Sequence, residues 1–452
     1  MIGIALLLVA IYLYFRPKYR YISYFLYLSF MMGNSGGGGL GLWTDEVLGV
    51  KNSDCAVIYT SVIGLYLASQ GKWKIPKIKG RKILITFIVF LLASILFSYV
   101  YYGLSFYQIL QGCRSYLLIF SLPVLLQANP EEVRKVVRAL AWICLITGVL
   151  YILQILVVKG PVMPYPGKPG IDSTTGLVRM YNFPANLSVF LTLSFLCPEF
   201  LPRKVNLNLM RGILLLTLVC TLGRTGIATG ILLVMLALLM NGSFKKIGAA
   251  LVVIGILFLP FIGTISQRFE EGGTSNDLDQ ILKGNFDDNY ESHGDATMLY
   301  RFAWCYERAD YLAGRPLGEQ IFGMGFCSDS QDWTYKHYNF KLGLLNKDRM
   351  IPSQLTTPDI SFGNMITRLG FFGMVIYLAF YISIVLFFWN YRKCNILFLL
   401  MSAYSIILVA VAFAGSDLSE VRTFCLMFFI MSLAFHPYGK GLMKFDYSKT
   451  KQ

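Results

Sequence analysis

Apolar runs of about bilayer length recur along the whole chain and are separated by short polar connectors. One such run, residues 83–100, is ILITFIVFLLASILFSYV and contains no charged residue. About 20 apolar residues in a helix are needed to cross the roughly 30 Å hydrocarbon core of a bilayer. The runs lack the polar face, repeated at helical period, that helices on the surface of a soluble protein carry. The pattern therefore predicts an all-α polytopic membrane protein with about 12–14 transmembrane helices.

The connectors divide the chain into four regions around thirteen expected spans. Residues 1–265 form a transmembrane bundle of about ten spans with an outer connector at 159–180, and 359–437 hold the C-terminal spans. Between them, 266–358 form one large, mainly helical loop, and 438–452 form a basic tail. The expected spans are 1–15, 21–42, 54–69, 83–100, 106–126, 139–158, 181–201, 212–223, 225–241, 247–265, 360–390, 395–414 and 423–437.

Composition and charge indicate the orientation of the spans. Only 14% of the residues are charged, against about 25% in soluble domains. The net charge of +15 comes largely from basic residues on every second connector, which is the positive-inside pattern of cytoplasmic loops. This placement puts loop 266–358 outside and the tail inside, and it argues against nucleic acid as a partner. The inner basic residues are Arg16, Lys18, Arg20, Lys72, Lys74, Lys77, Lys79, Arg81, Lys82, Arg134, Lys135, Arg138, Arg203, Lys204, Arg211, Lys245, Lys246, Arg392, Lys393 and the tail lysines.

The cysteines and the N-terminus add smaller constraints. Most of the 9 cysteines lie inside apolar runs, where thiols behave as small hydrophobic groups. Cys305 and Cys327 lie in the outer loop and are either free thiols or a disulfide. The first residues lack a basic segment and a small-residue cleavage site, so 1–15 is expected to remain as a span. The sequence has no phosphate-binding Gly-Lys loop and no dinucleotide glycine motif, which argues against nucleotide-driven chemistry.

Arginines near the outer ends of the spans are the candidate ligand-binding residues. Ionisable groups at membrane depth are costly and commonly mark functional sites, and a guanidinium suits bidentate contact with phosphate. An arginine at a span end can also simply extend its head group to the interface, and Arg114, inside a span, is expected to pair with a polar neighbour. Two candidates lie seven residues apart in a helix expected at 297–313, on one face and about 10 Å apart. The candidates are Arg179, Arg224, Arg301, Arg308, Arg368 and Arg422.

Asp359 stands at the mouth of the span that follows the outer loop. A carboxylate beside arginines could take a proton from a sugar hydroxyl as a general base. It could instead cap the following helix, a position that Asp favours, and both roles stay open here. The acidic run at 287–295 matches no metal-ligand spacing and is interpreted as a solvated loop. Neither a metal nor a cofactor is predicted.

Three elements together resemble the bacterial O-antigen polymerase and O-antigen ligase superfamily, over roughly residues 175–440. The short spans that meet at TLGRTG (221–226) look like that family's Ser-Arg-Gly/Thr element. The helix with YRFAW (300–304), followed by GEQIFGMGF (318–326), resembles its Arg-and-Trp helix and Gly-x-Gly turn. The segment PDISFGNMITRLGFFG (358–373) resembles the ligase segment that ends in Gly-x-x-Gly.

The resemblance implies a GT-C-like glycosyltransferase of the bacterial cytoplasmic (inner) membrane, with its active site on the extracytoplasmic face. Arg224 and Arg301 match arginines thought to bind the diphosphate of a polyprenyl donor. Asp359 lies where ligases carry a histidine, which favours a polymerase over a ligase. The implied reaction transfers a glycan from polyprenyl diphosphate to a lipid-linked oligosaccharide repeat, building O-antigen, capsule or exopolysaccharide. The implied protein partners are a chain-length regulator and a flippase.

Two other functions are compatible with these features. A transporter or flippase of lipid-linked oligosaccharide would also carry many spans and arginines, although the chain lacks the repeated halves of many transporters. A glycosyltransferase that uses lipid monophosphate sugars would place acidic residues in the first outer loop, where Asp45, Glu46 and Asp54 lie. Turnover of lipid-linked repeats, as opposed to their movement alone, would separate the three functions.

Overall fold

The computed structural model is mostly helical, and its helices follow the apolar runs of the sequence. It describes residues 2–31, 46–47, 50–73, 80–163, 170–171, 178–180, 182–201, 205–221, 223–243, 247–248, 298–343, 345–346, 349–355 and 360–435. Within these ranges, strands occur only as three antiparallel hairpins of two-residue strands. They are β1 (Glu46–Val47) with β2 (Val50–Lys51), β3 (Gly170–Ile171) with β4 (Val178–Arg179), and β5 (Leu345–Asn346) with β6 (Ile351–Pro352).

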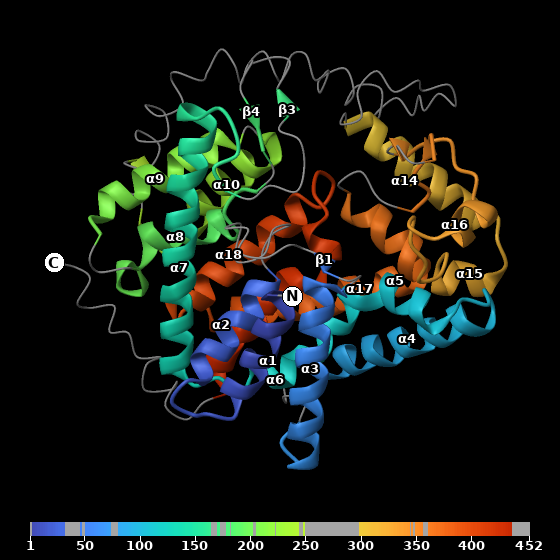
Figure 1. Cartoon of the computed structure of the whole chain (residues 1–452), viewed down its shortest axis with the longest axis horizontal. Helices are drawn as coiled ribbons and strands as arrows, with labels where there is room; N and C mark the ends of the chain where they lie inside the picture. Colours follow the sequence, from blue (N-terminus) through green and yellow to red (C-terminus); the bar gives the residue numbers. More distant parts are fainter. Residues whose placement is uncertain are drawn as a thin grey trace.

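The helices pack around a shared core (Figure 1). The first part of the chain forms α1 (Ile2–Tyr14), α2 (Arg20–Phe30), α3 (Asn52–Ser69), α4 (Arg81–Val100), α5 (Phe106–Leu117), α6 (Leu122–Leu125), α7 (Pro130–Ile152), α8 (Leu187–Leu196), α9 (Leu207–Cys220) and α10 (Arg224–Met240). The later part forms α14 (Met298–Ala313), α15 (Leu317–Phe322), α16 (Asp332–His337), α17 (Ser361–Tyr391), α18 (Ile396–Ala410) and α19 (Cys425–Met431). In Figure 1, α14–α16 lie on one side and α7–α10 on the other.

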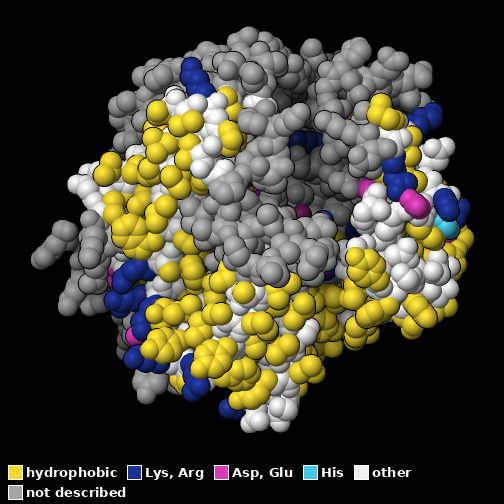
Figure 2. Space-filling model, in the orientation of Figure 1, with side chains coloured by type: hydrophobic (Ala, Val, Ile, Leu, Met, Phe, Trp, Pro, Cys, Tyr) yellow, Lys and Arg dark blue, Asp and Glu magenta, His cyan; other side chains and the backbone are white. Residues whose placement is uncertain are grey.

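Three of the described helical stretches are long and apolar enough to cross a membrane: 81–100, 130–157 and 361–391. The middle one continues α7 through a π-helical turn, η2 (Leu153–Val157). Most of the other expected spans coincide with shorter helices, such as α8 with 10 residues. Large apolar side chains on the helix surfaces remain exposed, including Leu65 at 72% and Val100 at 71%. Figure 2 shows hydrophobic side chains over much of the described part of one face.

Local capping explains where two helices begin. At the start of α7 the Asn129 side chain accepts from the Glu132 amide at 2.9 Å, and the Glu132 carboxylate accepts from the Asn129 amide at 2.8 Å. At the start of α5 Ser105 and Gln108 make the same reciprocal pair. Such capping boxes satisfy amide groups that have no partner inside the helix. They also set the residues at which α5 and α7 begin. From those residues on, the apolar faces of both helices pack into the core.

Two of the expected spans are interrupted helices. The stretch 106–126 forms α5, then the 3-10 helix η1 (Leu118–Ser121), then α6. In α17 the backbone of Gly370 has φ 69°, a left-handed conformation that glycine adopts without steric cost. A Cβ at this position would lie 2.6 Å from the Gly323 nitrogen. The kink therefore lets α17 meet the turn that follows α15.

The described part of the outer loop is mainly helical, and its first helix, α14, lies close to the predicted range 297–313. Elements α14 and α15 both pack on α17, and Gly363 of α17 leaves room for the Trp304 ring, whose nearest atom would lie 2.5 Å from a Cβ. Cys305 and Cys327 are free thiols. Burial raises the pKa of each thiol to about 11.

Basic connectors that the charge pattern assigns to one side of the membrane lie together in the structure. The Arg20 guanidinium and the Glu132 carboxylate form an ion pair at 2.8 Å, which joins the start of α2 to the start of α7. Lys135 lies 5.1 Å from the centre of the Tyr21 ring, and Arg138 donates to the Glu199 carbonyl oxygen at 3.1 Å. We call this group the basic cluster.

Several expected features lie outside the described residues. They are most of the span 247–265, the first part of the outer loop with its acidic run 287–295, Asp359 and the tail 438–452.

Candidate functional site

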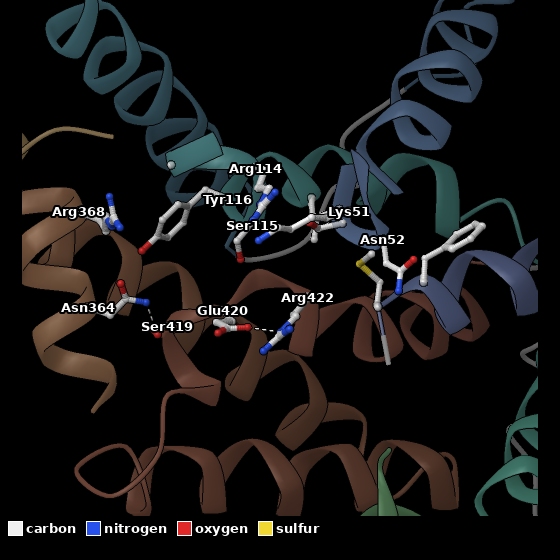
Figure 3. Close-up of a pocket in the computed structure, with 15 residues that line it drawn as sticks. Lys51, Asn52, Arg114, Ser115, Tyr116, Asn364, Arg368, Ser419, Glu420 and Arg422 are labelled. Carbon is white, nitrogen blue, oxygen red and sulfur yellow. Dashed lines mark hydrogen bonds and ion pairs between the residues drawn. The ribbon is translucent and has the colours of Figure 1, made fainter. Parts of the chain in front are cut away.

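A cavity of about 290 Å³ lies where the ends of five segments meet (Figure 3). The segments are the end of α2, the start of α3, the end of α5, the first half of α17, and the turns η5 (Asp417–Ser419) and η6 (Val421–Phe424). Its volume is near the lower end of the range for small-molecule pockets. The lining residues are Phe30, Met31, Lys51, Asn52, Ser53, Gly112, Arg114, Ser115, Tyr116, Leu118, Asn364, Arg368, Ser419, Glu420 and Arg422.

Four cationic side chains line this cavity, against one carboxylate. They are Lys51, Arg114, Arg368 and Arg422, and the carboxylate is Glu420. Like charges at close range repel, so the arrangement lowers its energy when an anion enters. The four come from positions far apart in the sequence, which shows that the fold gathers them.

Each arginine of the cavity is oriented by a protein acceptor. Nη1 of Arg114 lies 3.4 Å from both carboxylate oxygens of Asp54, near the start of α3. Nη1 of Arg368 donates to the Cys327 carbonyl oxygen, and Nε of Arg422 pairs with the Glu420 carboxylate. A guanidinium has five N–H donors, so each contact fixes the head group and leaves further donors for a ligand.

The turn that holds Arg368 is built on close backbone contacts. Gly323 and Gly325 both have φ 83°, and the Met324 amide donates to the Thr367 carbonyl oxygen at 2.8 Å. The next residue, Phe326, passes so near to Gly112 of α5 that a Cβ there would lie 2.5 Å from its backbone. The turn 323–327 therefore joins α5 to α17 and sets the position of Arg368 beside the cavity.

Two hydroxyl groups of the cavity lining are buried without a hydrogen-bond partner. They are Oγ of Ser115 and the phenolic oxygen of Tyr116. In Figure 3 the Tyr116 hydroxyl points toward Arg368 and Asn364, and the Ser115 hydroxyl points toward the segment that carries Glu420. A buried hydroxyl without a partner is costly. Both groups could therefore donate to an oxygen-rich ligand, and the lining suits a phosphate-like anion.

The arginines predicted from the sequence take different positions. Arg368 and Arg422 line the cavity. Arg301 is not in the lining, and its Nη1 donates to the Ala414 carbonyl oxygen at 3.3 Å, in the connector between α18 and η5. Arg114 was expected to pair with a polar neighbour, and it pairs with the Asp54 carboxylate, but it also lines the cavity.

Arg308 does not line the cavity that holds Arg368 and Arg422. Its side chain is fully buried, and the guanidinium donates to the carbonyl oxygens of Leu342 and Gln354 and to the Glu307 carboxylate. The guanidinium carbon lies 4.1 Å from the centre of the Trp304 ring. Burial lowers the pKa of the Arg308 guanidinium to about 10. These contacts use the guanidinium to hold the outer loop together.

Three other predicted site residues are Arg179, Arg224 and Asp359. The backbone of Arg224 begins α10, as expected for a site between two short apolar runs. Arg179 lies in β4, opposite Gly170 in β3. Asp359 lies outside the described residues. Their membership of the site stays a prediction.

Sequence reasoning did not single out Lys51, Ser115, Tyr116 or Glu420 as site residues. Lys51 and Glu420 are charged residues next to outer span ends, and that was the only signal that could have marked them. Nothing local distinguishes Ser115 and Tyr116 from the other hydroxyl residues of the apolar runs. Comparison with known proteins adds no assignment, because no protein-family model and no curated protein matches this chain.

Proposed function

We propose that this chain is a multi-pass protein of the bacterial cytoplasmic membrane that polymerises polyprenyl-diphosphate-linked oligosaccharide repeats on the extracytoplasmic face. The observation that carries the proposal is the cavity with its four cationic side chains and two unpartnered hydroxyls. A lipid diphosphate is an anion with many acceptor oxygens, and this lining matches it in charge and in hydrogen bonding.

The positions of the cavity and of the basic cluster support the proposed membrane orientation. The cavity gathers residues from connectors and span ends that the charge pattern assigns to the outside, including Lys51, Arg368 and Arg422. The basic cluster, with the Arg20–Glu132 ion pair, gathers connectors assigned to the inside. Helix α7 and its π-helical turn run from the basic cluster toward the connector 159–180. Near that end Gln154 donates to Asn182, just after the connector, at 2.8 Å. A helix of 28 residues is about 42 Å long at 1.5 Å per residue, which is enough to cross a bilayer.

The chemistry proposed for the cavity is stabilisation of the leaving group. When the acceptor hydroxyl attacks the anomeric carbon of the donor, negative charge grows on the departing lipid diphosphate. Arginines already held in place stabilise that charge more in the transition state than in the ground state. Donor and acceptor are both lipid-linked, so the proposal needs no metal or nucleotide sugar. Arg224 and Arg301 belong to it through the family resemblance, together with a chain-length regulator and a flippase as partners.

Reconstitution tests the proposed reaction. The purified protein in lipid vesicles should convert a polyprenyl-diphosphate-linked repeat into a ladder of longer glycans on electrophoresis. Transfer of a finished glycan to a different acceptor would indicate a ligase, and movement of the unchanged repeat across the bilayer would indicate a flippase. Deletion of the gene should remove surface glycan longer than one repeat. A protein that neither elongates nor moves the repeat would contradict the proposal.

Cysteine labelling tests the orientation. Asp310→Cys in α14 and Lys72→Cys after α3 both replace exposed side chains, on segments assigned to opposite sides. An impermeant maleimide should label the first variant in intact cells and the second only after the membrane is opened. Labelling of the Lys72→Cys variant in intact cells would overturn the orientation.

A further inference from the structure

Glu420 holds a distinctive place among the residues that the structure describes around the cavity. It is the one carboxylate in the lining, beside four cationic side chains. Its side chain is 24% exposed, so a ligand in the cavity can reach it. Asp54 pairs with the lining residue Arg114 and accepts from the Lys51 amide at 2.8 Å, but it is absent from the lining.

The backbone that carries Glu420 is held from both sides. The Asn364 side chain donates to the Ser419 hydroxyl at 2.9 Å, and the Tyr377 hydroxyl donates to the Leu418 carbonyl oxygen at 2.8 Å. Leu418 and Val421 are buried on either side of the exposed carboxylate. These contacts tie the segment to both halves of the kinked helix α17. A catalytic group gains from such a fixed position, because little reorganisation is then needed during reaction.

Arg422 fixes the orientation of the carboxylate. Its Nε pairs with one Glu420 oxygen, and Figure 3 shows the pair on the wall opposite Arg114 and Ser115. A donor diphosphate held by Arg114 and Arg368 would therefore have the Glu420 carboxylate across the cavity from it. That is the side from which an acceptor hydroxyl must approach in a direct displacement.

We infer that Glu420 is the general base that removes the proton from the acceptor hydroxyl. The inference rests on the proposed function and assigns the role first considered for Asp359 to a residue on the cavity wall. In this step the hydroxyl oxygen forms a bond to the anomeric carbon while its proton passes to the Glu420 carboxylate. The bond from the anomeric carbon to the diphosphate oxygen breaks, and the diphosphate leaves with the electron pair. Direct displacement inverts the anomeric configuration.

Glu420→Gln tests the role when two acceptors are compared in the same reconstituted system. With the natural hydroxyl acceptor, loss of a general base should slow polymerisation by about 10² to 10⁴-fold. Azide is an anionic acceptor with no proton to remove, so its transfer to the donor sugar should continue close to the wild-type rate. The product, an inverted glycosyl azide, is identified by mass spectrometry and NMR.

Two further variants complete the test. Asp417→Asn removes a carboxylate of the same segment that does not line the cavity, and it should polymerise normally. Asp359→Asn separates the two candidates for the base: it keeps its activity if Glu420 takes the proton, and a loss of polymerisation with retained azide transfer in this variant would assign the base to Asp359 and overturn the inference. Equal loss of transfer to hydroxyl and azide by Glu420→Gln would overturn the inference, as would wild-type polymerisation by that variant. If wild-type protein elongates no lipid-linked repeat, the proposed function itself fails, which is a separate result.

Discussion

The second half of the chain contains two arginine environments that differ in what the guanidinium contacts. Around Arg308 the contacts are protein carbonyls, a carboxylate and two aromatic rings, and the side chain is fully buried. Around Arg368 and Arg422 one protein acceptor orients each head group at the wall of a cavity. The first environment uses the charge to stabilise the loop, and the second presents charge to a ligand.

The comparison shows that sequence position does not reveal the role of an arginine here. Arg301 and Arg308 are seven residues apart on one helix, yet Arg301 supports the connector beside the cavity and Arg308 lies in the loop core. The role follows from the number of protein acceptors around the guanidinium. Substitutions at these positions should therefore separate loss of fold from loss of activity.

Removal of the buried arginine should have the largest effect on stability. Arg308→Ala removes the side-chain donor to the Leu342 and Gln354 carbonyls and the cation beside the Glu307 carboxylate, which should cost about 3 to 5 kcal/mol. Thermal unfolding in detergent and the amount of protein in membranes measure the loss. Arg349→Ala is the matched control, because that arginine pairs with an exposed Asp332 and should cost about 1 kcal/mol or less. Equal stability of the two variants would contradict the structural role of Arg308.

Removal of the cavity arginines should affect activity and leave the protein folded. Arg368→Ala should lower polymerisation roughly a hundredfold, about 3 kcal/mol of transition-state stabilisation. Arg422→Ala should also lower it, because the cavity loses a cation and Glu420 loses the partner that orients it. Lys at either position should restore only part of the rate, since it cannot make a bidentate contact. The measurement is glycan elongation at equal protein level, with Arg349→Ala as the control. Unchanged elongation by both Ala variants would mean that the cavity does not bind the leaving group.

Substitution of Gly370, whose contact with the α15 turn helps position Arg368, should lower both stability and activity. Gly370→Ala introduces a Cβ at φ 69° and 2.6 Å from backbone atoms of the α15 turn, a strain of about 1 to 3 kcal/mol. We expect lower stability together with lower activity, because the turn 323–327 also orients Arg368. Gly212→Ala in α9 meets no atom within 4 Å and should instead be neutral or stabilising by up to about 1 kcal/mol. Stability of Gly370→Ala equal to that of wild type would contradict the close contact.

The smallest expected effect concerns the native thiols of the outer loop. Cys305 and Cys327 have pKa values raised to about 11 by burial, so both stay protonated at neutral pH, and the thiolate is the reactive form. Each unit of pH increase below that pKa should raise the thiolate fraction about tenfold. Neither should react with a maleimide at pH 7 in folded protein, whereas Asp310→Cys should. Rapid labelling of native Cys305 or Cys327 at pH 7 would contradict the burial of these thiols in the structure.

Much of the helical architecture could be predicted because it depends on local chemistry. Apolar runs set the positions of α4, α7 and α17, and the helix 297–313 was placed to within a residue at its start. The break after α5 and the kink at Gly370 were not predicted, since apolar composition is the same in a straight helix and in an interrupted one. Gly370 was noted as part of a motif, but only its packing against Gly323 shows why glycine is needed.

The candidate site was predictable only in part. Arg368 and Arg422 were identified because charge at an outer span end is visible in sequence. Ser115 and Tyr116 were not, because a hydroxyl becomes informative only when the fold buries it without a partner.

Hydropathy and charge placement determined the all-α class and the expected sides of the connectors, because both depend on the transfer of individual groups between water and an apolar phase. The tertiary structure decided which charges meet. Lys51, Arg114, Arg368 and Arg422 lie in four separate segments, and only the packing of α3, α5 and α17 with the turns η5 and η6 brings them to one cavity. Electrostatic energy depends on distance and on burial, and neither quantity is contained in the order of residues along the chain.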